Sequence, residues 1–205
     1  MESTLRAGAD APGLKLIETF GHGSARVGLH RARMAASAKA LGWRFDPQAF
    51  DRVLACADPQ LGPRLRLTLD CFGTLDLGQA PLPATAALWR VALAQERLLS
   101  TDPWLAVKST RRAVYDAARA ALPQGMDEVI FTNERGEVCD GSITTVFFDR
   151  GDGLRTPPLS CGLLPGVLRA EMACPPEVLL AHDLPKVRLW VGNSLRGLIP
   201  ALWHA

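Results

Sequence analysis

Lysine is scarce in this chain of 205 residues. Its lysines are Lys15, Lys39, Lys108 and Lys186, and arginine supplies the rest of the 23 basic residues. Because 21 acidic residues nearly balance them, the net charge is only +2, which excludes the strongly basic composition typical of nucleic-acid-binding domains. The scarcity of lysine also restricts any amine chemistry to very few side chains.

Several other signatures are missing. The five cysteines include no Cys-x-x-Cys pair, and the four histidines show no ligand spacing with each other or with cysteine, so we expect reduced thiols and no metal site. The N-terminus lacks the apolar core of a signal peptide, and no apolar stretch approaches the roughly 18 residues that span a bilayer. Walker loop, nucleophile elbow and dinucleotide fingerprint are all absent. These absences predict a cytoplasmic protein with neither a membrane segment nor a nucleic-acid partner.

The hydrophobic pattern predicts an α+β fold with two subdomains, residues 1–100 and 101–205, of which the second is richer in strands. Gly42 predicts the end of one helix, and Asp46-Pro47 has the form of a helix N-cap followed by proline. Strands are expected over 14–20, 64–72, 86–94, 127–132, 138–150, 188–192 and 198–203. Helices are expected over 29–41, 46–57, 109–122 and 164–173, and loops over 1–13 and 75–82.

Lys108 lies where an apolar run, Trp-Leu-Ala-Val-Lys, meets the start of a predicted helix. Desolvation there would lower the pKa of its amine and make it a nucleophile. The alternative is a lysine whose head extends to water from the end of a strand.

Asp140 lies within Gly-Glu-Val-Cys-Asp-Gly-Ser, a pair of strands that turns at an acid and a glycine. A carboxylate inside a strand pair needs a partner, because an unpaired buried charge is costly. Three partners are compatible with this position: a protonated ring nitrogen of a ligand, the Gly141 turn, or an arginine.

Three further features are compatible with a bound phosphate. Gly166, Val167 and Leu168 begin a predicted helix whose first amides could bind an anion. Arg33 could contribute a guanidinium, and Asn193-Ser194 could contribute a hydroxyl and turn amides. Each also has a purely structural explanation: an ordinary helix start, a solvated helix face and a tight turn.

The order of these features resembles the class IV aminotransferase family, the fold-type IV enzymes that depend on pyridoxal phosphate. The resemblance covers residues 16 to 201 and rests on blocks that are specific in combination. These blocks are Glu18-Thr19-Phe20, His30-x-x-Arg33-Met34-x-x-Ser37, Lys108, Gly136-x-Val138-x-Asp140-Gly141, Leu164-Pro165-Gly166-x-x-Arg169 and Asn193-Ser194-Leu195-x-Gly197-x-x-Pro200.

The resemblance implies a role for each position. Lys108 would carry the cofactor and move protons, and Asp140 would face the pyridine nitrogen. Phosphate binding would fall to Arg33, to the amides of Gly166, Val167 and Leu168, and to Asn193 and Ser194. The family usually has glutamate where Asp140 stands and asparagine where Thr145 stands.

Within the family, the Asn193–Pro200 ending and the run from Thr156 to Gly166 are most similar to 4-amino-4-deoxychorismate lyase, which makes p-aminobenzoate and pyruvate. An aminotransferase acting on a branched-chain or D-amino acid and a non-catalytic relative stay open as alternatives. Arg26, Arg111 and Arg112 are candidates for binding a substrate carboxylate, or are surface arginines. The family resemblance also implies a small-molecule amino substrate and a homodimer.

Overall fold

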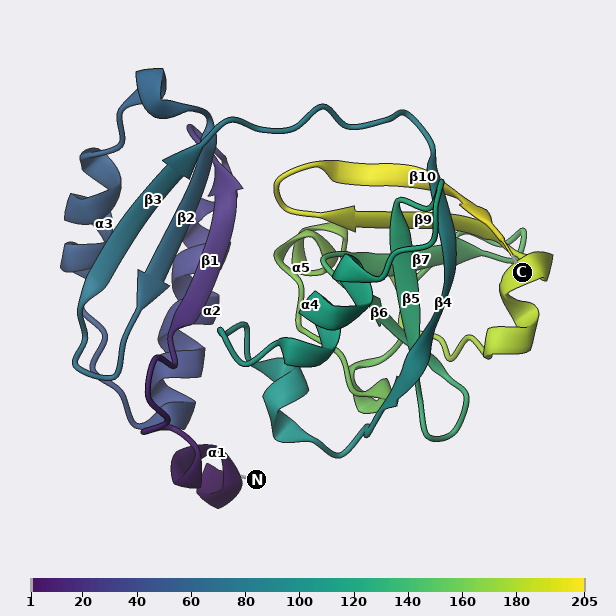
Figure 1. Ribbon diagram of the computed structural model, residues 1–205, viewed down its shortest axis with the longest axis horizontal. Coiled ribbons are helices and arrows are strands. Elements are labelled where there is room, and N and C mark those ends of the chain that lie inside the picture. Colours follow the sequence, from purple (N-terminus) through teal and green to yellow (C-terminus); the bar gives the residue numbers. More distant parts are fainter. Residues whose placement is uncertain (1, 205) are drawn as a thin grey trace. The chain divides into compact units, whose positions relative to one another are not determined.

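The computed structural model describes residues 2–204, which divide into two units by their contacts (Figure 1). The N-terminal unit comprises the residues up to Ala84 and the segment Val107–Arg111. The C-terminal unit comprises Thr85–Ala106 and the residues from Arg112 onward. The predicted α+β class is confirmed. The predicted division into a small subdomain, 1–100, and a larger one, 101–205, stays a prediction.

The N-terminal unit contains a three-stranded antiparallel sheet in the order β1-β2-β3, with α2 and α3 against one face (Figure 1). Leu65, Leu67 and Leu69 of β2 are buried, whereas the residues between them are not, as expected for a strand with one covered face. The elements are α1 (Glu2–Ala7), β1 (Leu16–Gly21), α2 (Val27–Leu41), α3 (Pro47–Ala55), η1 (Pro59–Leu61), β2 (Arg64–Leu69) and β3 (Leu75–Ala80).

Local signals placed α2 and α3 correctly, but two other predictions for this unit were wrong. Gly42 ends α2 with φ of 75°, and the Asp46 side chain accepts a hydrogen bond from the amide of Gln48 at the start of α3. Residues 75–82 were predicted as a loop because of their glycine and prolines, yet Leu75–Ala80 pairs along its whole length with β2. The predicted lead-in 1–13 includes the helix α1.

The C-terminal unit is built on a seven-stranded sheet in the order β6-β5-β4-β10-β9-β7-β8, and an additional β6–β7 pairing closes it into a barrel-like form. The predicted strand 138–150 is therefore two strands that meet at a turn. The elements are β4 (Trp89–Leu98), η2 (Pro103–Ala106), α4 (Ala113–Ala120), β5 (Glu128–Asn133), β6 (Val138–Gly141), β7 (Thr145–Asp149), β8 (Leu154–Arg155), η3 (Leu159–Cys161), α5 (Val167–Met172), η4 (Ala181–Lys186), β9 (Arg188–Asn193) and β10 (Gly197–Trp203).

Both faces of the central strand β5 are covered. Ile130 packs into a cluster with Val91 and Val191, whereas Phe131 packs on the opposite side with Cys139 and Cys161. Because side chains alternate along a strand, a strand buried on both faces shows a continuous apolar run without alternation. This double burial fixes the positions of β5 and β6, and hence of Asp140.

The helix predicted to begin at Ser109 or Thr110 begins instead at Ala113, with Arg112 as its N-cap. Residues 107–111 are not available for a helix, since they pair with the edge of β1. The amide of Ile17 donates to the carbonyl of Lys108 at 2.9 Å, and Ser109 forms an antiparallel bridge with Leu16.

Within residues 2–204, no helix is both long enough and apolar enough to cross a membrane.

Candidate functional site

In the N-terminal unit, a buried acid lies between an arginine and a histidine. Glu18 on β1 is 1% exposed, and its two carboxylate oxygens accept hydrogen bonds from Nε and Nη2 of Arg33 on α2 at 2.9 and 2.6 Å. Nδ1 of His30, one helical turn earlier, donates to the same carboxylate. Two donors on one side of α2 thus bind the same carboxylate on β1. Because the guanidinium of Arg33 is planar and donates two parallel hydrogen bonds, its orientation is fixed.

The pKa of Glu18 follows from these contacts. Burial alone would raise it, but the charge of Arg33 and the hydrogen bonds from His30 and Arg33 outweigh burial and hold the pKa below its ordinary value. A lowered pKa in the folded state stabilises the fold above the pKa of the unfolded glutamate, and that contribution is lost as the pH falls through the folded pKa.

We therefore expect Glu18→Gln to lower the free energy of unfolding by about 3 kcal/mol at neutral pH, because it removes the counter-charge of Arg33. The difference from the unsubstituted protein should shrink as the pH falls below about 4, where Glu18 itself becomes protonated. Urea unfolding of both proteins, from neutral pH to below about pH 4, measures this difference in the free energy of unfolding. The control is Asp76→Asn, which breaks an exposed ion pair with Lys15 and should cost less than about 1 kcal/mol. A difference that stays constant into acid would contradict the assignment.

Lys108 belongs to the same unit as Arg33. Its carbonyl is bonded to Ile17, the neighbour of Glu18, so β1 connects the backbone of the lysine to the residue that orients Arg33. The backbone of the 107–111 segment is tied further by Thr110, whose amide donates to the carbonyl of Lys15 and whose hydroxyl accepts from the Lys15 amide.

The C-terminal unit positions Asp140, Gly166 and Gly192 around one residue, Thr145. Asp140 on β6 pairs directly with Thr145 on β7, and Thr145 pairs with Gly192 on β9. A Cβ atom on Gly166 would lie 2.6 Å from Oγ1 of Thr145, so only glycine allows the start of α5 to approach β7 this closely.

Asp140 is 6% exposed, and its Oδ2 accepts a hydrogen bond of 2.8 Å from the amide of Leu164. Tyr115 lies near enough for the two groups to interact: burial raises the pKa of the Tyr115 phenol, and the negative charge of Asp140 raises it further. Tyr115 therefore stays protonated, while the loop before α5 supplies a donor to the Asp140 carboxylate.

The turn between Asp140 and Thr145 is organised by Glu128, which the sequence analysis missed. Its carboxylate, fully buried at the start of β5, accepts from the amides of Ser142 and Ile143 and from the hydroxyls of Ser142 and Thr144. A Cβ atom on Gly141 would lie 2.9 Å from Oε2 of Glu128, which explains the glycine after Asp140. The available signal was an acid, Glu128, at the first position of a strand that continues with three apolar residues.

The other predicted phosphate-binding residues lie in this unit as well. Gly166 caps α5 without a side chain, so Val167 and Leu168 begin the helix with no side-chain cap on their amides. Asn193 ends β9, and its side chain holds the following turn by accepting from the amides of Leu195 and Arg196. Its Nδ2 also donates to Ile143, which joins the buried Ser194 turn to the Glu128-organised loop.

The three arginines predicted to bind substrate differ in their contacts. Arg112 donates to Asp116 at 2.7 Å and to the carbonyl of Ser142 at 3.1 Å, which gives it a structural role in the C-terminal unit. Arg26 is the N-cap of α2, and Arg111 lies in the 107–111 segment; both belong to the N-terminal unit.

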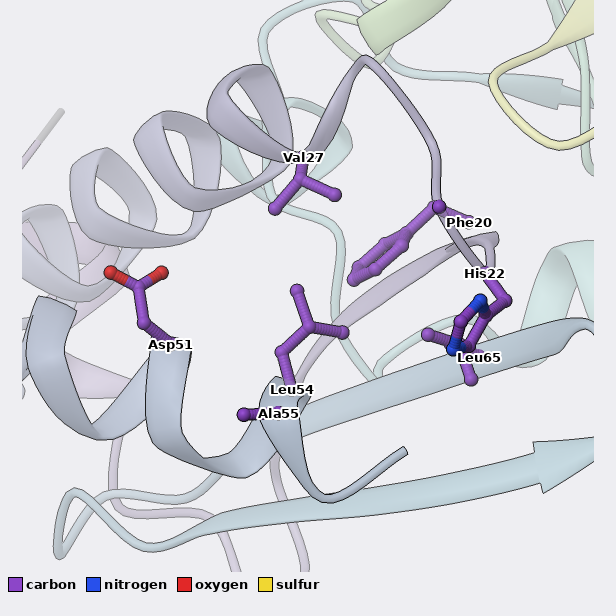
Figure 2. Close-up of a pocket in the computed structure, with 8 residues that line it drawn as sticks. Phe20, His22, Val27, Asp51, Leu54, Ala55 and Leu65 are labelled. Carbon is purple, nitrogen blue, oxygen red and sulfur yellow. The ribbon is translucent and has the colours of Figure 1, made fainter. Parts of the chain in front are cut away.

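A hollow of about 370 Å³ lies in the N-terminal unit between α2, α3 and the sheet (Figure 2). Its lining is mostly apolar, and none of the predicted site residues contributes to it. The lining residues are Phe20, His22, Gly23, Val27, Asp51, Leu54, Ala55 and Leu65. We therefore place no predicted cofactor contact in this hollow.

Comparison with known proteins gives one family. Residues 17–202 match the family described as amino-transferase class IV. A provisionally named aminodeoxychorismate lyase from Schizosaccharomyces pombe is 27% identical over 150 residues, which are 70% of this chain and 65% of the relative. The chain thus aligns with just under two thirds of that curated relative.

Solved structures show the same fold. A provisionally named amino-acid aminotransferase from Mesorhizobium loti is similar with a TM-score of 0.87 and 41% identity, over 93% of this chain and all of that one. The 4-amino-4-deoxychorismate lyase from Pseudomonas aeruginosa has a TM-score of 0.81 at 22% identity, over 94% of this chain and 84% of that one. A PLP-bound hypothetical aminotransferase from Mycobacterium tuberculosis has a TM-score of 0.77 at 23% identity, over 95% and 83%.

Proposed function

The chain belongs to the class IV aminotransferase family of pyridoxal-phosphate enzymes, and we propose that it is a lyase that converts 4-amino-4-deoxychorismate into p-aminobenzoate and pyruvate. The arrangement around Thr145 is the observation that carries the cofactor assignment. There a carboxylate, a glycine-started helix and the end of β9 occupy neighbouring positions of one barrel-like sheet.

The residues present fit the cofactor chemically. The glycine at position 166 leaves room where a side chain would collide with Thr145, and the uncapped amides after it suit a phosphate dianion. We assign Arg33, the amides of Gly166, Val167 and Leu168, and the Asn193-Ser194 turn to phosphate binding. Asp140 is assigned to the ring nitrogen and Lys108 to the aldehyde. When bound, the cofactor supplies an electron-accepting ring.

Each assigned residue then has a defined task. Glu18 orients the guanidinium of Arg33, which we assign to the phosphate as a bound cation. Asp140, itself held by the Leu164 amide, keeps a ring nitrogen protonated by its negative charge. Lys108 would remove a proton from the ring carbon that bears the amine as the carbon–oxygen bond to the enolpyruvyl group breaks, and the ring becomes aromatic. The released enolpyruvate takes up one proton at its methylene carbon and becomes pyruvate.

The choice of lyase rests on the C-terminal motifs, and it is supported by the curated relative that carries that name. The Mesorhizobium loti structure, at 41% identity, favours a second candidate, an aminotransferase that needs a 2-oxo acid acceptor. Both candidates use the same cofactor contacts and differ in what must be added for turnover. A homodimer stays a prediction for either one.

We expect the purified protein, loaded with pyridoxal phosphate, to release pyruvate and p-aminobenzoate in equal amounts from 4-amino-4-deoxychorismate with no 2-oxo acid present. Coupling pyruvate to lactate dehydrogenase and separating p-aminobenzoate by chromatography measures both products. A matched reaction with added 2-oxoglutarate should run no faster, because elimination consumes no amino acceptor. The cofactor-free protein is the blank.

Turnover that appears only with a 2-oxo acid would replace the lyase by the aminotransferase. Uptake of the cofactor without turnover of either kind would reject both substrate assignments and keep the cofactor site. A protein that takes up no pyridoxal phosphate would be the non-catalytic relative.

A further inference from the structure

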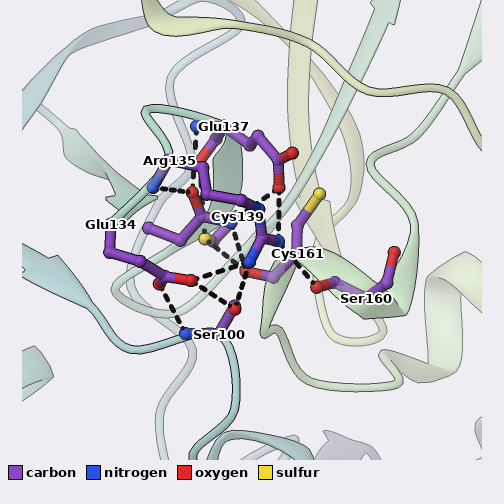
Figure 3. A network of polar contacts seen from close by, with 8 residues as sticks. Ser100, Glu134, Arg135, Glu137, Cys139, Ser160 and Cys161 are labelled. Carbon is purple, nitrogen blue, oxygen red and sulfur yellow. Dashed lines mark hydrogen bonds and ion pairs between the residues drawn. The ribbon is translucent and has the colours of Figure 1, made fainter.

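We propose that Asn133 and Arg135 are positioning residues: together they clamp the loop 159–166 so that the Leu164 amide meets the carboxylate of Asp140. We call this pair the 133–135 clamp. The inference rests on the proposed function in one respect: it takes Asp140 to face a bound cofactor. The hydrogen bonds of the clamp belong to the C-terminal unit itself (Figure 3).

Asn133 is the buried half of the clamp. Its side chain uses both ends: Nδ2 donates to Glu137 at 2.8 Å and to the carbonyl of Cys161 at 3.0 Å, while Oδ1 accepts from the amides of Arg135 and Glu137. A buried amide with these four hydrogen bonds stabilises a single geometry, because any rotation would leave polar atoms unsatisfied. The β5–β6 turn is thereby joined to η3.

Arg135 is the outer half. Its Nη2 donates to the carbonyl of Ser160 at 3.0 Å and to Glu137 at 2.7 Å, and its Nη1 donates to Ser100 and Glu134 (Figure 3). The clamp therefore holds two consecutive carbonyls, those of residues 160 and 161. Glu134 extends it by accepting from the amide and the hydroxyl of Ser100, just beyond β4.

Packing alone does not orient this loop. Cys161 and Leu163 bury their side chains in the core cluster around Phe131, which fixes where the loop lies. Burial of a side chain does not by itself orient the peptide planes beside it, because the hydrophobic effect has no direction. Hydrogen bonds to two successive carbonyls do fix the orientation of those planes.

Three residues after Cys161, the Leu164 amide points at Oδ2 of Asp140. Cys139 Sγ also donates to the Cys161 carbonyl at 3.1 Å, and η3 has backbone hydrogen bonds of its own. To these the clamp adds the hydrogen bonds from Asn133 and Arg135 that direct the Leu164 donor.

The charges of the clamp are stable across the neutral range. Hydrogen bonds from the Ser100 hydroxyl and amide lower the pKa of Glu134 to about 2. Hydrogen bonds from Arg135 and Asn133 lower that of Glu137 to about 2. Both carboxylates thus stay ionised at any pH suitable for the assay, and any effect of clamp variants is attributable to the missing side chain and not to titration.

The test uses Arg135→Ala and Arg135→Lys, with Arg150→Ala as the matched control. Arg150 also pairs with two carboxylates, those of Glu177 and Asp183, and its side chain is 35% exposed against 44% for Arg135. Its recorded hydrogen bonds go to carboxylates and not to a loop carbonyl. Lysine keeps the charge of Arg135 but lacks the planar guanidinium that bonds two groups at once. Arg135→Lys should therefore lie between Arg135→Ala and the unsubstituted protein in both measured quantities.

Two quantities are measured on the full chain. Hydrogen exchange of the cofactor-free protein, followed in peptides that contain Leu164, should speed up on the order of tenfold in Arg135→Ala. The Kd for pyridoxal phosphate should rise by about tenfold, as expected when a hydrogen bond to a charged group is weakened. Arg150→Ala should match the unsubstituted protein in both, even if its melting temperature falls as much.

Unchanged exchange at Leu164 in a folded Arg135→Ala protein would overturn the clamp. So would an equal change in the Arg150→Ala control. Faster exchange at Leu164 in a protein that binds no pyridoxal phosphate at all would support the clamp and reject the proposed function. If Arg135→Ala does not fold, Arg135→Lys gives the same comparison with the charge retained.

Discussion

Lys108→Ala is expected to give a folded protein that has lost the visible absorption band of lysine-bound pyridoxal phosphate and at least about a thousandfold of its activity. In the proposed function, this side chain supplies the amine that attaches the cofactor and moves the proton. The fold should persist, because the contacts that hold this segment to β1 come from the backbone: Ile17 donates to the Lys108 carbonyl, and Ser109 bridges to Leu16. Absorption spectra after incubation with the cofactor, together with the pyruvate assay, measure both losses.

Lys39→Ala is the matched control. Lys39 is an exposed lysine in the last turn of α2, in the same unit as Lys108. Its removal should leave the absorption band and the activity within about twofold of those of the unsubstituted protein. Substitutions at the surface rarely change the free energy of unfolding by more than about 0.5 kcal/mol. A Lys108→Ala protein that still forms the band would show that a different amine carries the cofactor, and with so few lysines each alternative can be tested in turn.

Asp140→Asn is expected to lower kcat by about 100-fold while the protein stays folded. Asparagine keeps an oxygen that can accept the bond from the Leu164 amide, so the loop before α5 stays in place. It removes the negative charge that would keep a ring nitrogen protonated, and a neutral ring accepts electrons poorly. The effect should therefore appear in kcat and in the absorption spectrum, with a smaller change in cofactor affinity.

Two comparisons isolate the cause. Asp116→Asn removes an exposed acid that pairs with Arg112 and should leave kcat unchanged. Asp140→Glu keeps the charge at the length usual in the family, but its extra methylene must fit against the Leu164 amide, so we expect activity between those of the aspartate and the asparagine proteins. An asparagine variant with full activity would show that Asp140 does not serve the ring nitrogen.

Aspartate at position 140 fits the local geometry of this chain. β6 and β7 meet at Asp140 and Thr145, and Gly166 approaches the hydroxyl of Thr145 more closely than any other residue could. The amide of Leu164 reaches the shorter carboxylate directly, and the 133–135 clamp holds the same loop through the carbonyls of residues 160 and 161. The shorter acid and the threonine in place of the usual asparagine thus occur together with a loop that lies close to both.

The sequence alone identified the family and predicted much of the local structure. The order of the motif blocks gave the family, and the cap residues Asp46 and Gly42 marked where helices begin and end. These features depend on neighbours a few residues apart, which is the range over which side chains and backbone dihedrals act directly. The assignment of Lys108 to the cofactor likewise came from the sequence alone, and it stays a prediction.

Only the tertiary structure decided the long-range pairings. The local sequence predicts a loop over residues 75–80, but in the structure they pair with β2. It predicts a helix start within residues 107–111, but the backbone there pairs with β1. Two contacts of buried acids also appeared only in the structure: Glu18 accepts hydrogen bonds from Arg33, and Glu128 accepts hydrogen bonds from the turn after Gly141. Apart from the pairs next to the β2–β3 turn, each of these contacts joins residues separated by ten or more positions. Such contacts depend on how strands pair and in which register, which no local pattern encodes.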